Sequence, residues 1–233
     1  MDNPSRQTLV HNGLQYSVWY DKVRAEKKMI GFYDYTVILT YCGMISAFAG
    51  ILNAINGNYR TALICLMFTG LCDMFDGTVA STKKSRNKKE KRFGIQIDSL
   101  SDLISFGVLP AVFVYMYSGK TFFSGAIAAV YTLLALIRLS YFNVDEEERQ
   151  DNTRERRSEY LGVPVTTVAL LLPLVYLLYK GGLLSNTLWI NVIFLMISIF
   201  FVLAVKVKKP HVLGKIMVLL LGIFEMALLI IIK

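Results

Sequence analysis

The sequence is poor in charged residues and in the side chains on which many soluble enzymes rely. Asp, Glu, Lys and Arg make up only 18 % of the 233 residues, and the mean hydropathy is +0.48. The two histidines lie far from any motif, and the three cysteines show no metal-ligand spacing, so we interpret Cys42, Cys65 and Cys72 as core residues. No Gly-rich nucleotide loop, Ser-His-Asp set or internal repeat is apparent. The composition predicts one polytopic membrane domain.

Long apolar runs are abundant. Seven runs are long enough to span a bilayer, near residues 35–54, 59–80, 95–117, 122–143, 162–180, 187–205 and 212–232. The last run contains Lys215 and Glu225, so we expect an all-α protein with six to seven transmembrane helices in residues 34–233. Residues 1–33 mix basic and aromatic side chains, which predicts a cytosolic tail with an interfacial helix and no cleavable signal.

The basic residues alternate between the two sides of the predicted membrane. Four segments hold eighteen of them, at residues 22–28, 83–92, 145–160 and 206–209, whereas the intervening loops and the last residue hold one each. The net charge of +8 therefore indicates topology rather than nucleic-acid binding, and it places the 81–93 loop in the cytosol. The 83–92 run is either a topology determinant alone or also an attractor for anionic lipid or cytidine phosphates.

Four aspartates interrupt the second and third apolar runs. On an ideal helix, Asp73 and Asp76 lie about 60° apart, and Gly77 and Ala80 lie on the same face. Gly94, Asp98 and Asp102 follow at intervals of four and form a stripe along the next helix. Helix lengths place Asp76 and Asp98 at similar depth, Asp98 about four residues from the start of its helix. A carboxylate at membrane depth is costly unless it is paired, hydrated or bound to a cation, so its presence indicates function.

Carboxylate oxygens are the ligands of hard divalent cations, and Mg²⁺ is commonly held by a few carboxylates together with substrate phosphates. If the two helices are antiparallel neighbours, the pattern predicts a shallow pocket for a metal-bound pyrophosphate. The alternative is that the aspartates are helix-end residues or pair with nearby lysines. The acidic run at residues 145–148 favours a solvated loop over a second metal site.

The pattern from Asp73 to Asp102 resembles the signature of the CDP-alcohol phosphotransferases, D-x2-D-G-x2-A-R followed by G-x3-D-x3-D. The chain departs from it at Ser81, where the family has arginine, and in a longer loop before Gly94. The segment G-I-Q-I-D-S-L-S-D-L-I-S-F-G-V-L-P at residues 94–110 is similar to the phosphatidylserine synthase branch. So is R-L-S-Y-F-N at residues 138–143.

The resemblance implies an integral membrane enzyme that transfers the phosphatidyl group of CDP-diacylglycerol to L-serine, giving phosphatidylserine and CMP. It implies two divalent cations, Mg²⁺ or Mn²⁺, held by Asp73, Asp76, Asp98 and Asp102, with Asp102 as general base. The implied donor-binding residues are Gly77, Ala80, Ser81, Lys83 and Gly94, with Lys83 or Lys84 standing in for the missing arginine. A homodimer is the family expectation. The distribution of basic residues predicts a cell-membrane protein whose four-aspartate pocket faces the cytosol.

Arg138 and Asn143 are candidates for binding the serine acceptor, because Arg138 lies within an apolar run and needs an acceptor group there. A structural partner for Arg138 is an equal alternative. Within the family the acceptor could instead be glycerol 3-phosphate or inositol phosphate. A divalent-cation transporter is the alternative from another class, although transporters place such carboxylates near the bilayer midplane. The composition gives no support for a nucleic-acid partner.

Overall fold

The computed structural model describes residues 30–83, 85–152, 159–208 and 212–231. Contacts divide the chain into two compact units, Met1–Tyr33 and Asp34–Lys233, and the second unit is described below. The expected interfacial helix lies outside the described residues, as does Lys84. The assignment of residues 1–33 to a separate domain therefore stays a prediction.

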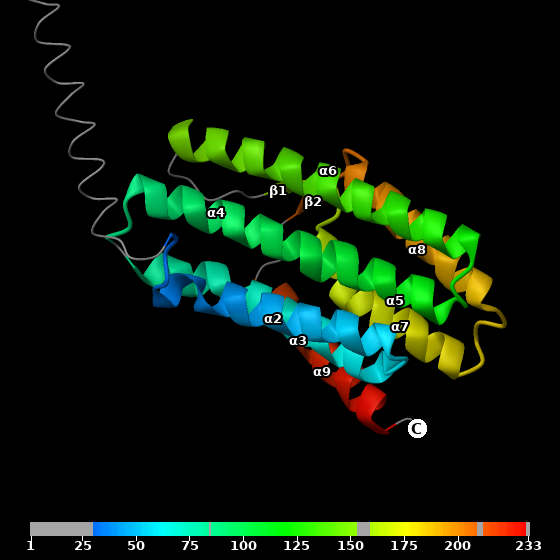
Figure 1. Cartoon of the computed structure of the whole chain (residues 1–233). Coiled ribbons are helices and arrows are strands. Elements are labelled where there is room, and N and C mark those ends of the chain that lie inside the picture. The colour runs from blue at the N-terminus through cyan, green and yellow to red at the C-terminus, as the bar shows by residue number, and fades with distance from the viewer. Residues whose placement is uncertain (1–29, 84, 153–158, 209–211, 232–233) are drawn as a thin grey trace, which may run out of the picture. The chain divides into compact units, whose positions relative to one another are not determined.

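The described part of the second unit is almost entirely helical (Figure 1). Its helices are α2 (Tyr35–Ile55), α3 (Tyr59–Thr82), α4 (Lys88–Asp102), α5 (Leu109–Tyr117), α6 (Phe122–Asn152), α7 (Val168–Lys180), α8 (Thr187–Val202) and α9 (Val212–Ile231). A π-helical segment, η1 (Leu103–Val108), joins α4 to α5, and a 3-10 turn, η2 (Val165–Thr167), precedes α7. Two short strands, β1 (Glu159–Leu161) and β2 (Lys206–Lys208), pair antiparallel with Glu159 opposite Lys208.

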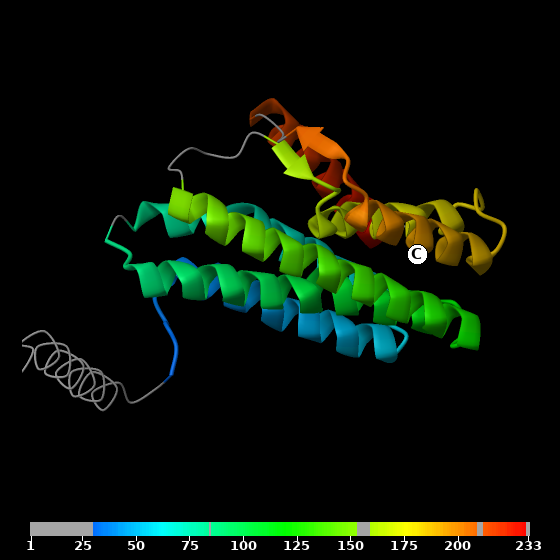
Figure 2. The ribbon, with the colours of Figure 1, turned by 90° about the horizontal axis from the view of Figure 1, so that it is seen from above.

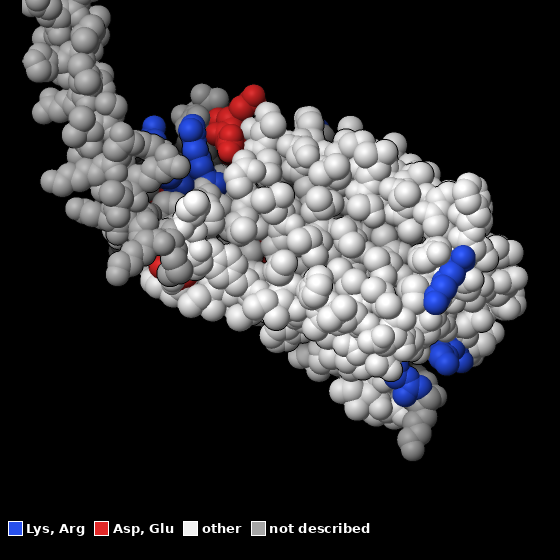
Figure 3. Space-filling model, viewed as in Figure 1, with Lys and Arg blue, Asp and Glu red and all other residues white. Residues whose placement is uncertain are grey.

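The predicted polytopic bundle is confirmed. Four helical stretches are long and apolar enough to cross a membrane: Tyr35–Ile55, Tyr59–Thr82, Lys88–Tyr117 and Phe122–Glu148. Three shorter apolar helices, Val165–Lys180, Thr187–Val202 and Ile216–Ile231, follow at the remaining predicted spans. On the face shown in Figure 3, the coloured charged side chains lie toward the two ends and the surface between them is uncharged. This is the charge distribution of a protein surrounded by lipid.

Small residues allow α2 and α3 to pack closely. Gly43, Ala47, Gly50 and Ala54 form one buried stripe along α2. A Cβ atom at Gly43 would lie 3.3 Å from the Cβ of Cys72, and one at Gly50 would lie 3.0 Å from the Cβ of Cys65. Such stripes replace the hydrophobic effect as the basis of helix association in lipid, because they permit close van der Waals contact.

The π-helical segment begins directly after Asp102. Pro110 has no N–H group, so it cannot donate to the carbonyl of Phe106 four residues earlier. The buried Tyr131 of α6 donates its hydroxyl to that carbonyl at 2.7 Å. The predicted span at 95–117 is therefore one continuous helical rod whose middle is wider than an α-helix, and the widening starts at the carboxylate stripe.

Three local predictions are wrong. The predicted loop at 81–93 is helical from Lys88 onward, because Asn87 and Glu90 form a capping box. Asp98 therefore lies about three turns from the start of its helix instead of about one. The predicted acidic loop at 145–148 belongs to α6, which continues to Asn152. Cys42 is exposed on the outer face of α2, unlike the buried Cys72, because a lipid-facing surface accepts an apolar thiol as readily as the core does.

The later helices gather on one side of the long ones (Figure 2). Both α7 and α9 contact α3, and α8 contacts α6. Gly70 of α3 meets Ala169 of α7 so closely that an added Cβ would lie 2.8 Å from the Cβ of Ala169. Glu225 of α9 is 1 % exposed, and neither of its carboxylate oxygens has a hydrogen-bond partner among the described residues.

Candidate metal centre and active site

Three of the four aspartates converge. Asp73 projects from α3, and Asp98 and Asp102 project from α4. One carboxylate oxygen of each lies within 4.8 Å of the others, and all three side chains are half-buried. The helical stripe predicted from the sequence thus faces Asp73, and the prediction that the carboxylates of two helices meet in one place is supported by their coordinates.

The fourth aspartate, Asp76, completes the group from the next turn of α3. Its carboxyl group lies within hydrogen-bonding range of Asp98. The hydroxyl of Thr40 on α2 donates to Asp76 Oδ2 at 3.4 Å, and the Thr40 carbonyl accepts from Ser101 of α4 at 3.4 Å. Thr40 therefore links α3 to α4. Sequence reasoning missed it, because a lone threonine in an apolar helix gives no signal of its partners.

The donor set fits a hard divalent cation. Mg²⁺ takes oxygen ligands at about 2.0–2.1 Å and is commonly bound through one or two carboxylates together with substrate phosphates. One carboxylate oxygen each of Asp73, Asp98 and Asp102 lies within 4.8 Å of the others, so these residues could share an ion. Four like charges this close repel one another unless protons or cations compensate them. The cluster is thus an aspartate group that could hold a divalent metal ion.

The sequence profile of the CDP-alcohol phosphatidyltransferase family matches residues 35–204, which include the whole carboxylate cluster. The chain belongs to this family. A CDP-diacylglycerol–serine O-phosphatidyltransferase of Saccharomyces cerevisiae is 34 % identical over 155 residues, covering 58 % of this chain and 54 % of that protein. The Helicobacter pylori protein of the same description is 31 % identical over 148 residues, covering 62 % and 56 %.

An archaetidylserine synthase of Methanothermobacter thermautotrophicus is 28 % identical over 190 residues, covering 81 % of this chain and 75 % of that protein. The match with the yeast and Helicobacter proteins spans little more than half of their length. The family assignment rests on the profile match over residues 35–204.

One small residue of the motif, Gly77, lies beside open space. Gly77 is exposed, and no atom lies within 4 Å of the position that a Cβ atom would take there. Ala80, one turn later, is half-buried. Ser81, which replaces the family arginine, is exposed and donates its hydroxyl to the carbonyl of Thr78 in its own helix at 2.7 Å. Ser81 therefore brings no positive charge to the cluster.

Lys83 has carboxylate partners outside the cluster. Its ammonium group lies 2.7 Å from Asp34 Oδ2 and 3.5 Å from Glu90 Oε2. The hydrogen bond from Lys83 lowers the pKa of Asp34 to about 2, and the same bond raises the pKa of Lys83. Asp34 is also the N-cap of α2 and accepts from the backbone N–H of Thr36. Lys83 thus ties the ends of α2, α3 and α4 together.

Gly94, the first residue of the stripe formed with Asp98 and Asp102, lies against Arg86. Sequence reasoning did not single out this arginine. A Cβ atom at Gly94 would lie 2.5 Å from Nη2 of Arg86, which donates to the carbonyl of Glu90 at 3.3 Å. The only sequence signal for this contact was the small size of Gly94.

The two predicted acceptor-binding residues have different neighbours. Asn143 accepts a hydrogen bond from Ser99, which adjoins Asp98 on α4. Arg138 is 7 % exposed, stacks on Phe142 at 5.3 Å and approaches Gly162. The two positions lie about 140° apart around an ideal helix. Asn143 is thus next to the carboxylate helix, whereas Arg138 lies against Phe142 of its own helix and Gly162 in the turn after β1.

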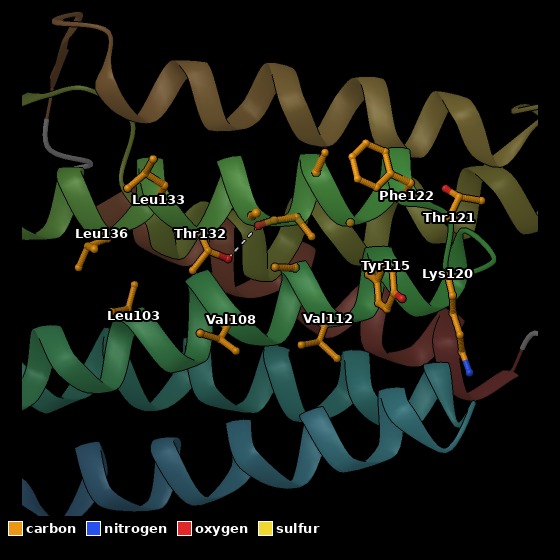
Figure 4. A pocket seen from close by; sticks show the side chains of 15 residues that line it. Leu103, Val108, Val112, Tyr115, Lys120, Thr121, Phe122, Thr132, Leu133 and Leu136 are labelled. Carbon is orange, nitrogen blue, oxygen red and sulfur yellow. Dashed lines mark hydrogen bonds between the residues drawn. The ribbon is translucent and has the colours of Figure 1, made fainter.

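A separate cavity of about 750 Å³ lies between the η1–α5 rod and α6 (Figure 4). Leu103 and Leu136 stand at one end of it and Lys120 and Thr121 at the other. The lining is apolar except for Lys120, Thr121, Tyr115 and Thr132. None of the four aspartates contributes to it, so the cavity offers no carboxylate ligand for a cation. Among the described residues, the carboxylate cluster is therefore the candidate metal site, and this cavity is not.

Proposed function

We propose that the protein transfers the phosphatidyl group of CDP-diacylglycerol to the hydroxyl of L-serine, which yields phosphatidylserine and CMP. The observation that carries this proposal is the convergence of Asp73, Asp98 and Asp102 within a chain of the CDP-alcohol phosphatidyltransferase family. Several relatives are described as serine transferases, and these descriptions support serine as the acceptor.

Asp73, Asp76, Asp98 and Asp102 would hold two divalent cations, Mg²⁺ or Mn²⁺. Bound there, the ions would neutralise charge on the pyrophosphate and on the leaving CMP. The open space at Gly77 leaves room for the donor to approach the backbone of α3. Ala80, Ser81, Lys83 and Gly94 complete the proposed donor-binding surface.

Asp102 would take the proton of the acceptor. In the reaction the serine oxygen bonds to the phosphorus that carries diacylglycerol, the bond from that phosphorus to the CMP oxygen breaks, and the serine proton passes to a carboxylate. Asp102 lies at the deep end of the stripe, beside Asp73 and at the start of the π-helical segment. A carboxylate has a low intrinsic pKa for deprotonating an alcohol, so its half-buried position among other carboxylates suits this role.

Arg138 and Asn143 are the proposed contacts for the serine carboxylate and amine. The hydrogen bond between Asn143 and Ser99 keeps Asn143 beside the carboxylate helix.

We further propose a cell-membrane location with the cluster facing the cytosol, because the basic segments adjoin the end of the bundle at which α3 leads into α4. A homodimer is proposed from the family resemblance alone. The alternative of a cation transporter gains no support, since Asp76 and Asp98 lie nearer one end of their helices than the middle of a broken span.

The test is the release of radiolabelled CMP from CDP-diacylglycerol by the purified full-length protein in detergent. L-serine should support release, and glycerol 3-phosphate and inositol phosphate should not. Removal of divalent ions by a chelator should stop the reaction, and added Mg²⁺ or Mn²⁺ should restore it. Release with another acceptor alone would overturn the serine assignment. Cation uptake into vesicles without any CMP release would overturn the enzyme assignment.

A further inference from the structure

Arg86 places a guanidinium group on the carboxylate face of α4. Its Nη2 atom lies 2.5 Å from the position of a Cβ atom at Gly94. Because Gly94, Asp98 and Asp102 follow at intervals of four, a Cβ at Gly94 would point in nearly the same direction as those of the two aspartates. The guanidinium therefore lies on their face of the helix, about one turn or ~6 Å along the axis from Asp98.

Arg86 has hydrogen-bonding capacity that the protein does not use. A guanidinium has five N–H donors in a fixed planar fork. Its Nη2 donates to the carbonyl of Glu90, whereas Nε is buried and has no hydrogen-bond partner among the described residues. A buried donor without an acceptor is unfavourable, so the position favours a ligand that supplies acceptor oxygens.

Among the described residues, neither Ser81 nor Lys83 has a free positive charge for this contact, and Lys84 lies outside the described residues. Ser81 is uncharged and bonded to its own helix, and the ammonium of Lys83 already contacts Asp34 and Glu90. Arg86 is thus the described cation that shares a helix face with the aspartates through Gly94. An arginine fork matches two phosphate oxygens at once, which a lysine does not.

We propose that Arg86 binds the phosphate groups of the CDP-activated donor and so replaces the arginine that the family motif has at the position of Ser81. The inference rests on the proposed function for the identity of the donor. It assigns the missing charge to a residue five positions further along the chain, brought back onto the stripe by the turn between α3 and α4. It also gives a reason for glycine at position 94, since any side chain there would displace the guanidinium.

The experiment compares Arg86→Gln, Arg86→Lys and, as a matched control, Lys88→Gln, which neutralises an exposed cation at the start of α4. Glutamine keeps a side-chain donor for the Glu90 carbonyl but loses the charge. Two quantities are measured on full-length protein: the Kd for CDP in the presence of Mg²⁺, and the KM values for CDP-diacylglycerol and serine. Thermal unfolding of each variant checks that it folds.

We expect Arg86→Gln to raise the Kd for CDP and the donor KM by about tenfold or more, because a hydrogen bond to a charged group is lost. The serine KM should not change, Arg86→Lys should be intermediate, and Lys88→Gln should match the wild type. Donor KM and Kd values within twofold of wild type for a folded Arg86→Gln would overturn the role of Arg86 while leaving the proposed function intact. A wild-type protein that binds CDP but releases no CMP would instead overturn the proposed function.

Discussion

Three helical glycines differ in the space beside them, and alanine at each position distinguishes packing within the protein from space for the donor. At Gly77 an added Cβ meets nothing within 4 Å, whereas at Gly70, two turns earlier in α3, it would lie 2.8 Å from the Cβ of Ala169. At Gly125 in α6 it would make an ordinary contact of 3.5 Å with Tyr115. Alanine at these sites therefore tests the free space beside each helix.

The expected changes in stability follow from helix propensity and packing. Replacing glycine by alanine within a helix stabilises it by roughly 0.5–1 kcal/mol where space allows. Gly77→Ala and Gly125→Ala should therefore keep or raise the melting temperature, by about 2–4 °C per kcal/mol. Gly70→Ala should lower it, since overpacking against the rigid Cβ of Ala169 costs about 1–3 kcal/mol.

The activity of the Gly77 variants should fall although their stability does not. If the donor approaches the backbone at Gly77, a methyl group there overpacks the complex by about 1–3 kcal/mol, which raises the donor KM about five- to a hundredfold. Gly77→Leu should be worse, and Gly125→Ala should leave the KM unchanged. CMP release and thermal unfolding of the same preparations measure both quantities. A normal donor KM for both Gly77 variants would refute the reasoning that this space receives the donor.

Three further results are expected. Asp102→Asn should lower kcat by about 10²–10⁴-fold with little change in donor KM, because it removes the proton acceptor but keeps an oxygen ligand; an active variant would remove Asp102 from that role. Lys83→Met should lower the melting temperature slightly at neutral pH. Because the folded-state pKa of Asp34 is depressed to about 2, this difference should vanish as the pH falls from about 4 to about 2, and a difference that persists at low pH would contradict the ion pair. Glu225→Gln should not lower the melting temperature, because it removes a buried charge without a partner; a large drop would show that the carboxylate has one.

Much of the candidate site was predictable because it follows from spacing along single helices. The interval of four between Asp98 and Asp102 places both on one face whatever the helix packs against. The capping box of Asn87 and Glu90 is equally local, and it starts α4 within the basic run, before the apolar stretch from which the span was predicted. The π-helical segment could not be derived, because Pro110 only removes a donor, whereas Tyr131 of another helix supplies the replacement.

Contacts between segments distant in the sequence were beyond such reasoning. Nothing local indicates that Thr40 reaches Asp76, that Lys83 bonds to Asp34, or that Arg86 folds back over Gly94. Each of these contacts depends on how α2, α3 and α4 pack and on the course of the turn between α3 and α4.

The sequence by itself determined that the chain is a helical membrane protein with two carboxylate-bearing helices, because hydropathy and helical periodicity are properties of single segments. The tertiary structure alone decided which carboxylate oxygens meet, that Arg86 lies against Gly94 and that open space remains beside Gly77. The distances between side chains on different helices depend on the side-chain volumes at every helix contact. Small residues such as Gly43 and Gly50 of α2, which lie against α3, therefore help to set the position of the helix that carries Asp73.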